Sequence, residues 1–349
     1  MSYREVDTVD VGDLGRRRLL GVGIGALALA HPGWTDLVAR ADAMRTGRVA
    51  RVGRGEVRVV EDVTVALSRL DDRYGGRAVR PVAAAFLKGP ATVALRADST
   101  EPVRGALTTA VAFCAYLTGW MAMDEGQDAL ARRHFDQALE LARSVDDQRS
   151  YRHILRGMSV HAVDLGEGRT AVDLAEASTA RPPQAGMVAF MAGQQAHAHA
   201  VAGDRAEAWR CLRRAERAMD RALSGAKTFG GYNPSTLQYH VAQVRHALGD
   251  TTGSVASLRA HFRLRDASDS DRSALRFGSM LAERQLQTGH LEAACASWGA
   301  VLDGLPSMQS GRVDQHVARI PGLLRPYLAS PVARQLNERV RQRTRGEGP

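Results

Sequence analysis

The segment Thr108–Asp147 reads "TTAVAFCAYLTGWMAMDEGQDALARRHFDQALELARSVDD" and carries the clearest structural pattern of the sequence. Its apolar residues recur at spacings of three and four on both sides of Asp124–Gly126, which is the pattern of two amphipathic helices joined by a tight turn. Two small residues, Gly119 and Ala131, leave room for a close approach of helices, and Phe135 supplies a large apolar side chain. The segment therefore predicts a helical hairpin.

The same register recurs four more times toward the C-terminus. Each copy contains a turn glycine, and these glycines lie at intervals of about 40 residues, slightly longer than the roughly 34 residues of a tetratricopeptide repeat (TPR). The turn glycines are Gly126, Gly166, Gly203, Gly249 and Gly289. Because a hairpin buries its apolar face only by stacking on the next one, five in order predict a right-handed α-solenoid of TPR-like hairpins.

Helical periodicity also extends upstream of the repeats. The segments Val59–Tyr74 and Arg80–Arg96 are predicted helices separated by Gly75–Gly76, and no segment of strand length alternates with a period of two. The predicted fold class is therefore all-α. We expect an N-terminal arm with a short apolar helix at residues 1–47, capping helices at 48–107, TPR-like repeats at 108–333 and a basic frayed tail at 334–349.

The composition is that of a folded protein and says little about its partners. The chain has 349 residues, of which 44% are hydrophobic, and a formal net charge of +9. Lys88 and Lys227 are the only lysines, and this preference for arginine is typical of a GC-rich genome, which weakens an argument for an acidic partner. The cysteines Cys114, Cys211 and Cys295 form no close pair and predict reduced core thiols in a cytoplasmic protein.

The stretch Gly15–Pro32 reads "GRRRLLGVGIGALALAHP" and allows three interpretations. Its arginines and apolar run fit a twin-arginine export signal, but four acidic residues precede Leu19 and argue against one. Gly21, Gly23 and Ala26 fit a dinucleotide-binding pattern, but no β-strand is predicted before them. The run is too short to span a bilayer. We favour a linker helix and keep export as the alternative.

The sequence offers few reactive side chains in a catalytic arrangement. His197 and His199 are two residues apart and point to different faces of a helix, so they cannot bind one metal ion as a pair. The metalloprotease, nucleophile-elbow and P-loop motifs are missing from the sequence, and the carboxylate pair Asp71–Asp72 lies at an expected helix end. We therefore expect no catalytic residue, no metal and no cofactor, in a protein that is not an enzyme.

Three segments in order carry a resemblance to a known family: "RRRLLGVG" (Arg16–Gly23), "LSRLDDRYGG" (Leu67–Gly76) and "LTGWMAMDEGQDALARRHFDQALELAR" (Leu117–Arg143). Over about residues 15–330 the sequence resembles the C-terminal TPR sensor region of actinobacterial transcriptional regulators that carry an N-terminal helix-turn-helix domain of the Xre type. The resemblance implies sensing and regulation. Only 15 residues precede Arg16, fewer than a helix-turn-helix domain needs, so we expect no direct DNA binding by this chain.

The resemblance also implies a binding groove, because in a TPR stack the first helix of each hairpin lines the concave face. The ligand-binding residues that it implies are Phe113, Tyr116, Trp120, Met123, His153, Arg156, Phe190, His197, Tyr239, Gln243, Arg276 and Glu283. Aromatic side chains at one end and basic side chains further along suit a peptide or small molecule with an apolar body and an acidic group. Alternatively, Phe113 and Trp120 only pack against the upstream helices.

These observations lead to one hypothesis and two alternatives. We expect a cytoplasmic, non-enzymatic regulatory protein that binds a peptide or small-molecule signal, or a protein partner, in the groove, contacts no membrane and is a candidate homodimer. The first alternative is a scaffold that assembles proteins, for example biosynthetic enzymes, on the same concave face. The second is a TPR protein exported by the twin-arginine route.

Overall fold

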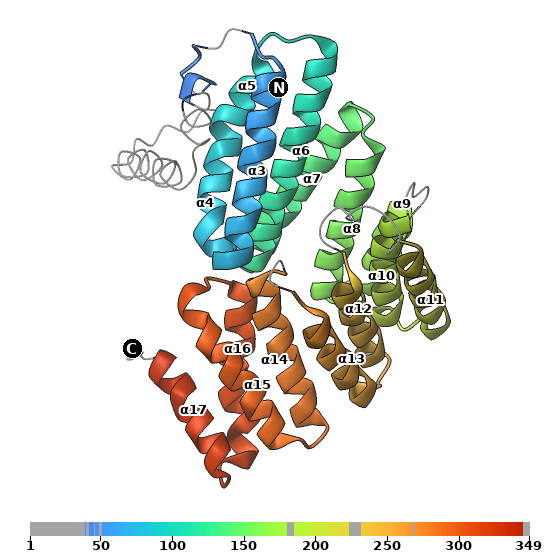
Figure 1. Ribbon diagram of the computed structural model, residues 1–349, viewed down its shortest axis with the longest axis vertical. Coiled ribbons are helices and arrows are strands. Elements are labelled where there is room, and N and C mark those ends of the chain that lie inside the picture. Colours follow the sequence, from blue (N-terminus) through green and yellow to red (C-terminus); the bar gives the residue numbers. More distant parts are fainter. Residues whose placement is uncertain are drawn as a thin grey trace.

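The structure is a computed structural model built from packed helices (Figure 1). It describes residues 51–179, 185–222, 232–266 and 269–344, together with Ala39, residues 42–44 and residues 46–48. From Arg54 onward these ranges contain fifteen α-helices, α3–α17, and no strand, with one isolated bridge between Arg51 and Asp98. The prediction of an all-α fold is confirmed.

Three helices precede the first hairpin. They are α3 (Arg54–Tyr74), α4 (Gly76–Phe86) and α5 (Thr92–Arg96), with a π-helical segment (Leu87–Ala91) before α5. The start of α3 is capped by Glu56, whose Oε2 accepts a hydrogen bond of 2.7 Å from the Gly53 N–H. Helices α3 and α4 both pack against α6, and they correspond to the helices predicted upstream of the repeats.

Five helical hairpins follow, each made of two helices that contact along their length. The hairpins are α6 (Glu101–Asp124) with α7 (Asp128–Ser144), α8 (Gln148–Asp164) with α9 (Gly168–Thr179), α10 (Ala185–Val201) with α11 (Arg205–Ala222), α12 (Pro234–Ala247) with α13 (Thr251–Leu264), and α14 (Asp271–Gln287) with α15 (Leu291–Gly304). The last two described helices are α16 (Gly311–Leu324) and α17 (Pro331–Thr344), which pack on α14 and α15 respectively.

The turns inside the hairpins are built as the sequence predicts. All five predicted turn glycines have a positive φ between 74° and 89°, a region that glycine enters without a steric penalty. At the first of them the Gly126 N–H donates to the Met123 carbonyl at 3.0 Å, and the next residue donates to Ala122 at 2.9 Å. Asp146, with a φ of 50°, takes the equivalent place between α7 and α8. The turns therefore fix where each helix ends.

The predicted packing register is also confirmed. Gly119 lies so close to α7 that a Cβ at this position would be 2.7 Å from the Phe135 ring. Phe135 and Trp298 are each 0% exposed, and the small residue at the start of the second helix of each hairpin is equally buried. The small residues are Ala131, Ala171, Ala208, Ser254 and Ala294. Close approach at small residues lets each hairpin bury its large side chains.

The C-terminal helices of the described chain contact the helices that precede the first hairpin. Helix α14 packs against α3, and Figure 1 shows α14–α17 below the ends of α3, α4 and α6. The Gln309 N–H donates to the Tyr74 carbonyl at 2.7 Å, and the Arg77 N–H donates to the Gln309 carbonyl at 3.1 Å. At Gly75 an added Cβ would be 2.4 Å from the Gln309 carbonyl oxygen, so the backbones meet directly. We call this contact the closure junction.

Helix α6 is the one helix in the described ranges whose length and apolarity would allow a membrane span. The packing of the fold explains these properties, since 78% of its apolar window is buried against neighbouring helices. The same test is passed by core helices, so it is weak evidence for a membrane segment.

Two sequence predictions concern the ends of the chain. The interpretations of Gly15–Pro32 lie outside the described residues. The expected frayed tail from residue 334 is wrong as far as Thr344, because α17 is a helix that buries Leu336 and Val340 against the C-terminal core. Its arginines occupy the solvent-facing side of an otherwise packed helix.

Candidate functional site

The first helices of successive hairpins bring their predicted groove residues together. Ring centroids lie 5.9 Å apart between Phe113 and His153, and 5.4 Å apart between His153 and Phe190, whose rings stack. Phe190 contacts Tyr232 edge-on at 5.3 Å. Further along the chain, Tyr239 stacks on Phe277 at 4.0 Å. Helices α6, α8, α10 and α12 therefore share an inner wall, which we call the aromatic wall.

The aromatic wall is packed rather than open. Most of the predicted residues are buried, with 8% exposure or less, namely Tyr116, Met123, His153, Arg156, Phe190, His197, Tyr239 and Gln243. Phe113 and Trp120 are partly buried and pack on the N-terminal core, as the alternative interpretation of these two residues states. A side chain at Gly157 would collide with Tyr116, since a Cβ there would be 2.4 Å from its ring. Little room remains along the wall for an extended peptide.

Arg156 is an unusual member of this wall because it is a buried cation among aromatic rings. Its guanidinium lies 3.9 Å from the centre of the Phe190 ring, and its Nε has no hydrogen-bond partner in the described part of the chain. Burial lowers the pKa of Arg156, and the groups that oppose this shift are Tyr116, Tyr232 and Tyr239 rather than a carboxylate. Among the described residues, Arg156 therefore has no anionic partner of the kind that a buried arginine normally has.

His197 on α10 connects this region with an acidic residue at the end of α8. Burial lowers the pKa of His197 to about 4, while Asp164 acts in the opposite direction. Gln243 accepts a hydrogen bond from Arg284, which also donates to Ser254 Oγ at 2.7 Å. The polar residues of the wall are thus held by neighbours on α13 and α14.

A pocket of about 320 Å³ opens where α14 and α16 meet the ends of α6 and α8. Its charged and ionisable lining residues are Asp128, Asp164, Arg276, Arg312, His316 and Arg319. Of the residues that the resemblance implied, Met123 and Arg276 line this pocket. Glu283 lies beside it and binds two of the lining residues, His316 at 2.8 Å and Arg319 at 3.1 Å.

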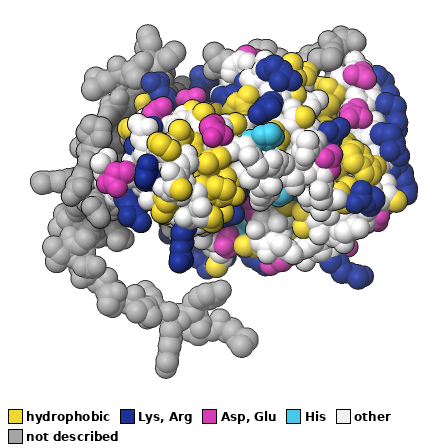
Figure 2. All heavy atoms as spheres, turned by 90° about the horizontal axis from the view of Figure 1, so that it is seen from below, with side chains coloured by type: hydrophobic (Ala, Val, Ile, Leu, Met, Phe, Trp, Pro, Cys, Tyr) yellow, Lys and Arg dark blue, Asp and Glu magenta, His cyan; other side chains and the backbone are white. Residues whose placement is uncertain are grey.

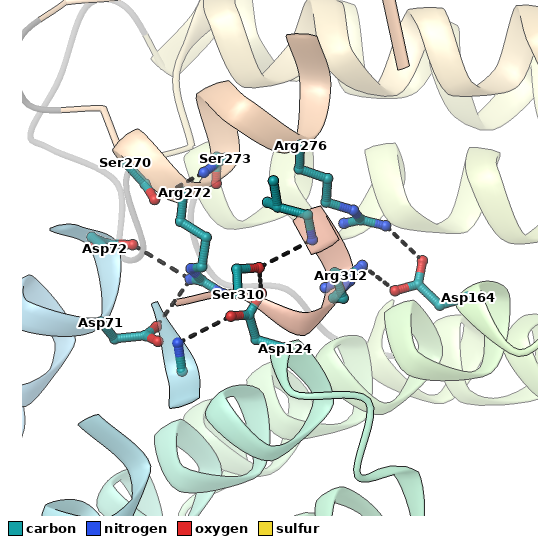
Figure 3. A network of polar contacts seen from close by, with 12 residues as sticks. Asp71, Asp72, Asp124, Asp164, Ser270, Arg272, Ser273, Arg276, Ser310 and Arg312 are labelled. Atoms are coloured by element: carbon teal, nitrogen blue, oxygen red, sulfur yellow. Dashed lines mark hydrogen bonds and ion pairs between the residues drawn. The ribbon is translucent and has the colours of Figure 1, made fainter. Parts of the chain in front are cut away.

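Two arginines whose side chains are 14% and 10% exposed, Arg276 and Arg312, share one carboxylate in the wall of the pocket (Figure 3). Arg276 lies 2.9 Å from Asp164 Oδ1, and Arg312 forms an ion pair with Oδ2 of the same side chain. Burial raises the pKa of Asp164, but the two guanidinium groups outweigh it and hold the pKa below its usual value. Burial, together with Arg276, lowers the pKa of Arg312 to about 10. The pocket therefore carries more positive than negative charge at this point.

A second ionic cluster adjoins the pocket at the closure junction. Arg272 on α14 lies 3.0 Å from Asp71, 3.5 Å from Asp72 and 3.6 Å from Asp124. Asp124 also accepts hydrogen bonds from Ser310 Oγ at 2.7 Å and from the backbone of α4. Asp71 lies at the helix end that the sequence predicts, but it is buried in this ionic cluster and not exposed to solvent. Burial raises its pKa to about 7, although Arg272 acts to lower it.

The face drawn in Figure 2 shows no comparable arrangement among the described residues. Figure 2 shows apolar, basic and acidic side chains mixed over the face seen from below, with basic side chains along the edge on the side where α11 lies. Helix α11 has six arginines in its eighteen residues, which accounts for the basic edge. A mixed surface of this kind is ordinary for a folded protein.

The sequence matches no protein-family model and no curated protein. The evidence for a site is therefore the geometry of the molecule itself. Sequence reasoning missed Asp164, Arg312, His316 and Arg319, because α16 stands outside the repeat register and Asp164 occupies the last position of its helix. The one local signal was an acidic residue at a helix end followed by a turn glycine, which also fits ordinary solvation.

Proposed function

We propose that this chain is a right-handed α-solenoid of TPR-like hairpins that acts as a non-enzymatic sensor of a small anionic molecule. The repeat register, the buried small and large residues and the turn glycines support a TPR-like architecture. The sequence resemblance to the sensor region of Xre-type regulators supports a link to transcription. The three cysteines among the described residues are buried and unpaired, in keeping with our proposal of a cytoplasmic protein.

One observation carries the choice of ligand: Arg276 and Arg312 share a single carboxylate beside the pocket. A ligand carboxylate or phosphate entering the pocket would supply the second negative charge, and buried arginines bind such groups with charge-assisted hydrogen bonds. The volume of about 320 Å³ lies at the lower end of the range for ligand sites, roughly 300–1,000 Å³. We therefore favour a small molecule over a peptide.

The position of the pocket suggests how occupancy would be transmitted. Its lining comes from α6 and the start of α7, from the end of α8, and from α14 and α16, which are separated in sequence and meet next to the closure junction. A ligand that contacts α6 or α8 on one side and α14 or α16 on the other would stabilise one spacing of these helices over another. The curvature of the stack would then change. A protein partner that recognises one curvature, such as a DNA-binding protein or a second copy of this chain, would then report the signal.

Calorimetry on the purified chain tests this proposal. The probes are small carboxylic acids and phosphate monoesters, each compared with its neutral amide or alcohol. We expect at least one anion to bind and Arg312→Gln to weaken it tenfold or more, while Asp164 keeps Arg276 as a partner. Arg339→Gln, which removes an exposed ion pair with Asp303 on α15, is the matched control. Equal binding of the neutral analogues, or an unchanged affinity in Arg312→Gln, would refute the proposal.

A further inference from the structure

The hairpin of α10 and α11 gathers three potential metal ligands. His199, Glu207 and Cys211 each offer one ligand atom, and these atoms all lie within 4.8 Å of one another. Glu207 and Cys211 are four residues apart on α11 and therefore share one face of the helix. His199 lies near the end of α10, just before the turn at Gly203, so the hairpin turn places it against α11.

The carboxylate of Asp204 lies beside the Nδ1 side of the His199 ring. His199 Nδ1 lies 3.6 Å from Asp204 Oδ2, while Asp204 Oδ1 accepts a hydrogen bond of 3.1 Å from the Glu207 N–H at the start of α11. A carboxylate on Nδ1 leaves Nε2 as the coordinating nitrogen, as in many histidine ligands of metals. The His199 side chain is only 7% exposed, and within the described residues its buried Nε2 has no hydrogen-bond partner. A buried imidazole nitrogen without a hydrogen bond is suited to bind a metal ion.

A fourth donor approaches from the preceding hairpin. Glu176 on α9 has its Oε1 3.5 Å from His199 Nε2, and its charge also acts on the Cys211 thiol. The side chains of Glu176 and Glu207 are 56% and 27% exposed. Glu176 can rotate, and Glu207 forms an ion pair with the exposed Arg210 through one carboxylate oxygen, which metal binding would replace or share. In a tetrahedral zinc site, bond lengths of about 2.0–2.3 Å place the ligand atoms roughly 3.3–3.8 Å apart. Small side-chain rotations would bring this cluster to that size.

We propose that His199, Glu207 and Cys211, completed by Glu176, form a structural site for a divalent transition metal, with zinc as the best match. A thiolate, an imidazole and carboxylates in a four-ligand arrangement suit Zn²⁺, whereas Mg²⁺ and Ca²⁺ prefer oxygen ligands. Metal binding releases the thiol proton, because the coordinating form of cysteine is the thiolate.

The site would join α9, α10 and α11, and it is independent of the proposed anion pocket. His197, two residues before His199, points to the other face of α10 and interacts with Asp164. The helical spacing of His197 and His199 excludes a metal bound by that pair, but it does not exclude one bound by His199 with residues of other helices. The ligands instead come from α9, α10 and α11, so no short sequence motif contains them all.

Cobalt titration of the tag-free, metal-depleted full-length chain tests the proposal. We expect one equivalent of Co²⁺ to give a thiolate-to-cobalt charge-transfer band with intense tetrahedral visible bands, and Zn²⁺ to displace it. Cys211→Ser should remove the charge-transfer band. Cys295→Ser, which changes a buried cysteine on α15, is the matched control and should keep it. The wild-type titration decides the matter by itself should Cys211→Ser not fold.

A gentler variant tests the orientation of His199. Asparagine caps helix N-termini as well as aspartate does, so Asp204→Asn keeps the start of α11 but removes the charge beside Nδ1. We expect the Zn²⁺ affinity, measured by competition with a chromophoric chelator, to fall about 10–100-fold. No charge-transfer band in the wild type, the same band in Cys211→Ser, or an unchanged affinity in Asp204→Asn would overturn the assignment.

Discussion

Arg272 on α14 lies 3.0 Å from the carboxylate of Asp71 on α3, although the two residues are 201 positions apart in the sequence. The side chains are 15% and 2% exposed, so this ion pair is largely removed from water. Around it, Asp72 and Asp124 add two further carboxylates (Figure 3). Arg272 is therefore the cation that allows the acidic ends of α3 and α6 to meet the start of α14.

The first prediction concerns this ion pair. Arg272→Met should lower the free energy of unfolding by about 3–5 kcal/mol, because it leaves buried carboxylates without their cation. The loss should be smaller at pH 6 than at pH 8, since Asp71 has a pKa raised to about 7 and can take up a proton. Urea denaturation at the two pH values measures the loss of unfolding free energy. Arg339→Met, at an exposed pair, should cost less than about 1 kcal/mol, and equal losses in the two variants would contradict the role of the closure junction.

The second prediction compares two glycines of the same helix, α6. Gly119→Ala should destabilise the fold by about 1–3 kcal/mol, because its Cβ would be 2.7 Å from the Phe135 ring. Gly105→Ala should instead stabilise it by about 0.5–1 kcal/mol, since a Cβ there meets nothing within 4 Å and alanine favours the helix. Thermal denaturation followed by circular dichroism distinguishes the two. A melting temperature that rises in Gly119→Ala would show that α6 and α7 are not in close contact.

The third prediction separates stability from binding at Arg156. Arg156→Met replaces a buried cation that has no carboxylate partner in the described part of the chain with an apolar side chain of similar length. We expect the stability to stay the same or rise by up to about 4 kcal/mol. If Arg156 contributes to the anion site through His197, the affinity for the anionic ligand should fall at the same time. A strong loss of stability would mean that Arg156 serves the fold alone.

The fourth prediction follows from the buried histidines. Burial lowers the pKa of His153 to about 3 and that of His197 to about 4, below the value of about 6.5 in the unfolded chain. Between those values only the unfolded state binds the protons, so the stability that these residues contribute is complete above pH 6.5 and is lost as the pH falls toward 4. Each contributes up to about 1.4 kcal/mol per pH unit.

Asp71 acts in the opposite direction over the same range. Its raised pKa makes the folded state hold a proton that the unfolded state has released, so its contribution grows as the pH falls from 7 toward 4. His240 and His246 also have lowered pKa values, so four histidines lower the stability as the pH falls while Asp71 alone raises it. Urea midpoints at pH 6.5, 5.5 and 4.5 should therefore decrease, and less steeply in His153→Gln. A midpoint that rises toward pH 4.5 would contradict this balance.

The sequence by itself determined the helices, the turns and the hairpins. Their signals are local: apolar spacing places a helix, and a glycine such as Gly126 or Gly289 permits the positive φ that ends it. Helix pairing within a hairpin is equally local, because residues like Gly119 and Phe135 are close in the chain. Repetition of the pattern then implied that the first helices of the hairpins share a wall. The structure brings groove residues such as Phe113, His153 and Phe190 together there.

Only the tertiary structure decided that the wall is packed, that the chain returns to its beginning and that a charged pocket forms there. Asp164 is separated by 112 residues from Arg276 and by 148 from Arg312. No local pattern encodes such pairs, because they depend on the summed rotation of every hairpin between them. The same holds for Asp71, whose burial and raised pKa come from a helix that follows it only after four intervening hairpins. Long-range charge pairing is a property of the closed stack, whereas the hairpins are properties of the sequence.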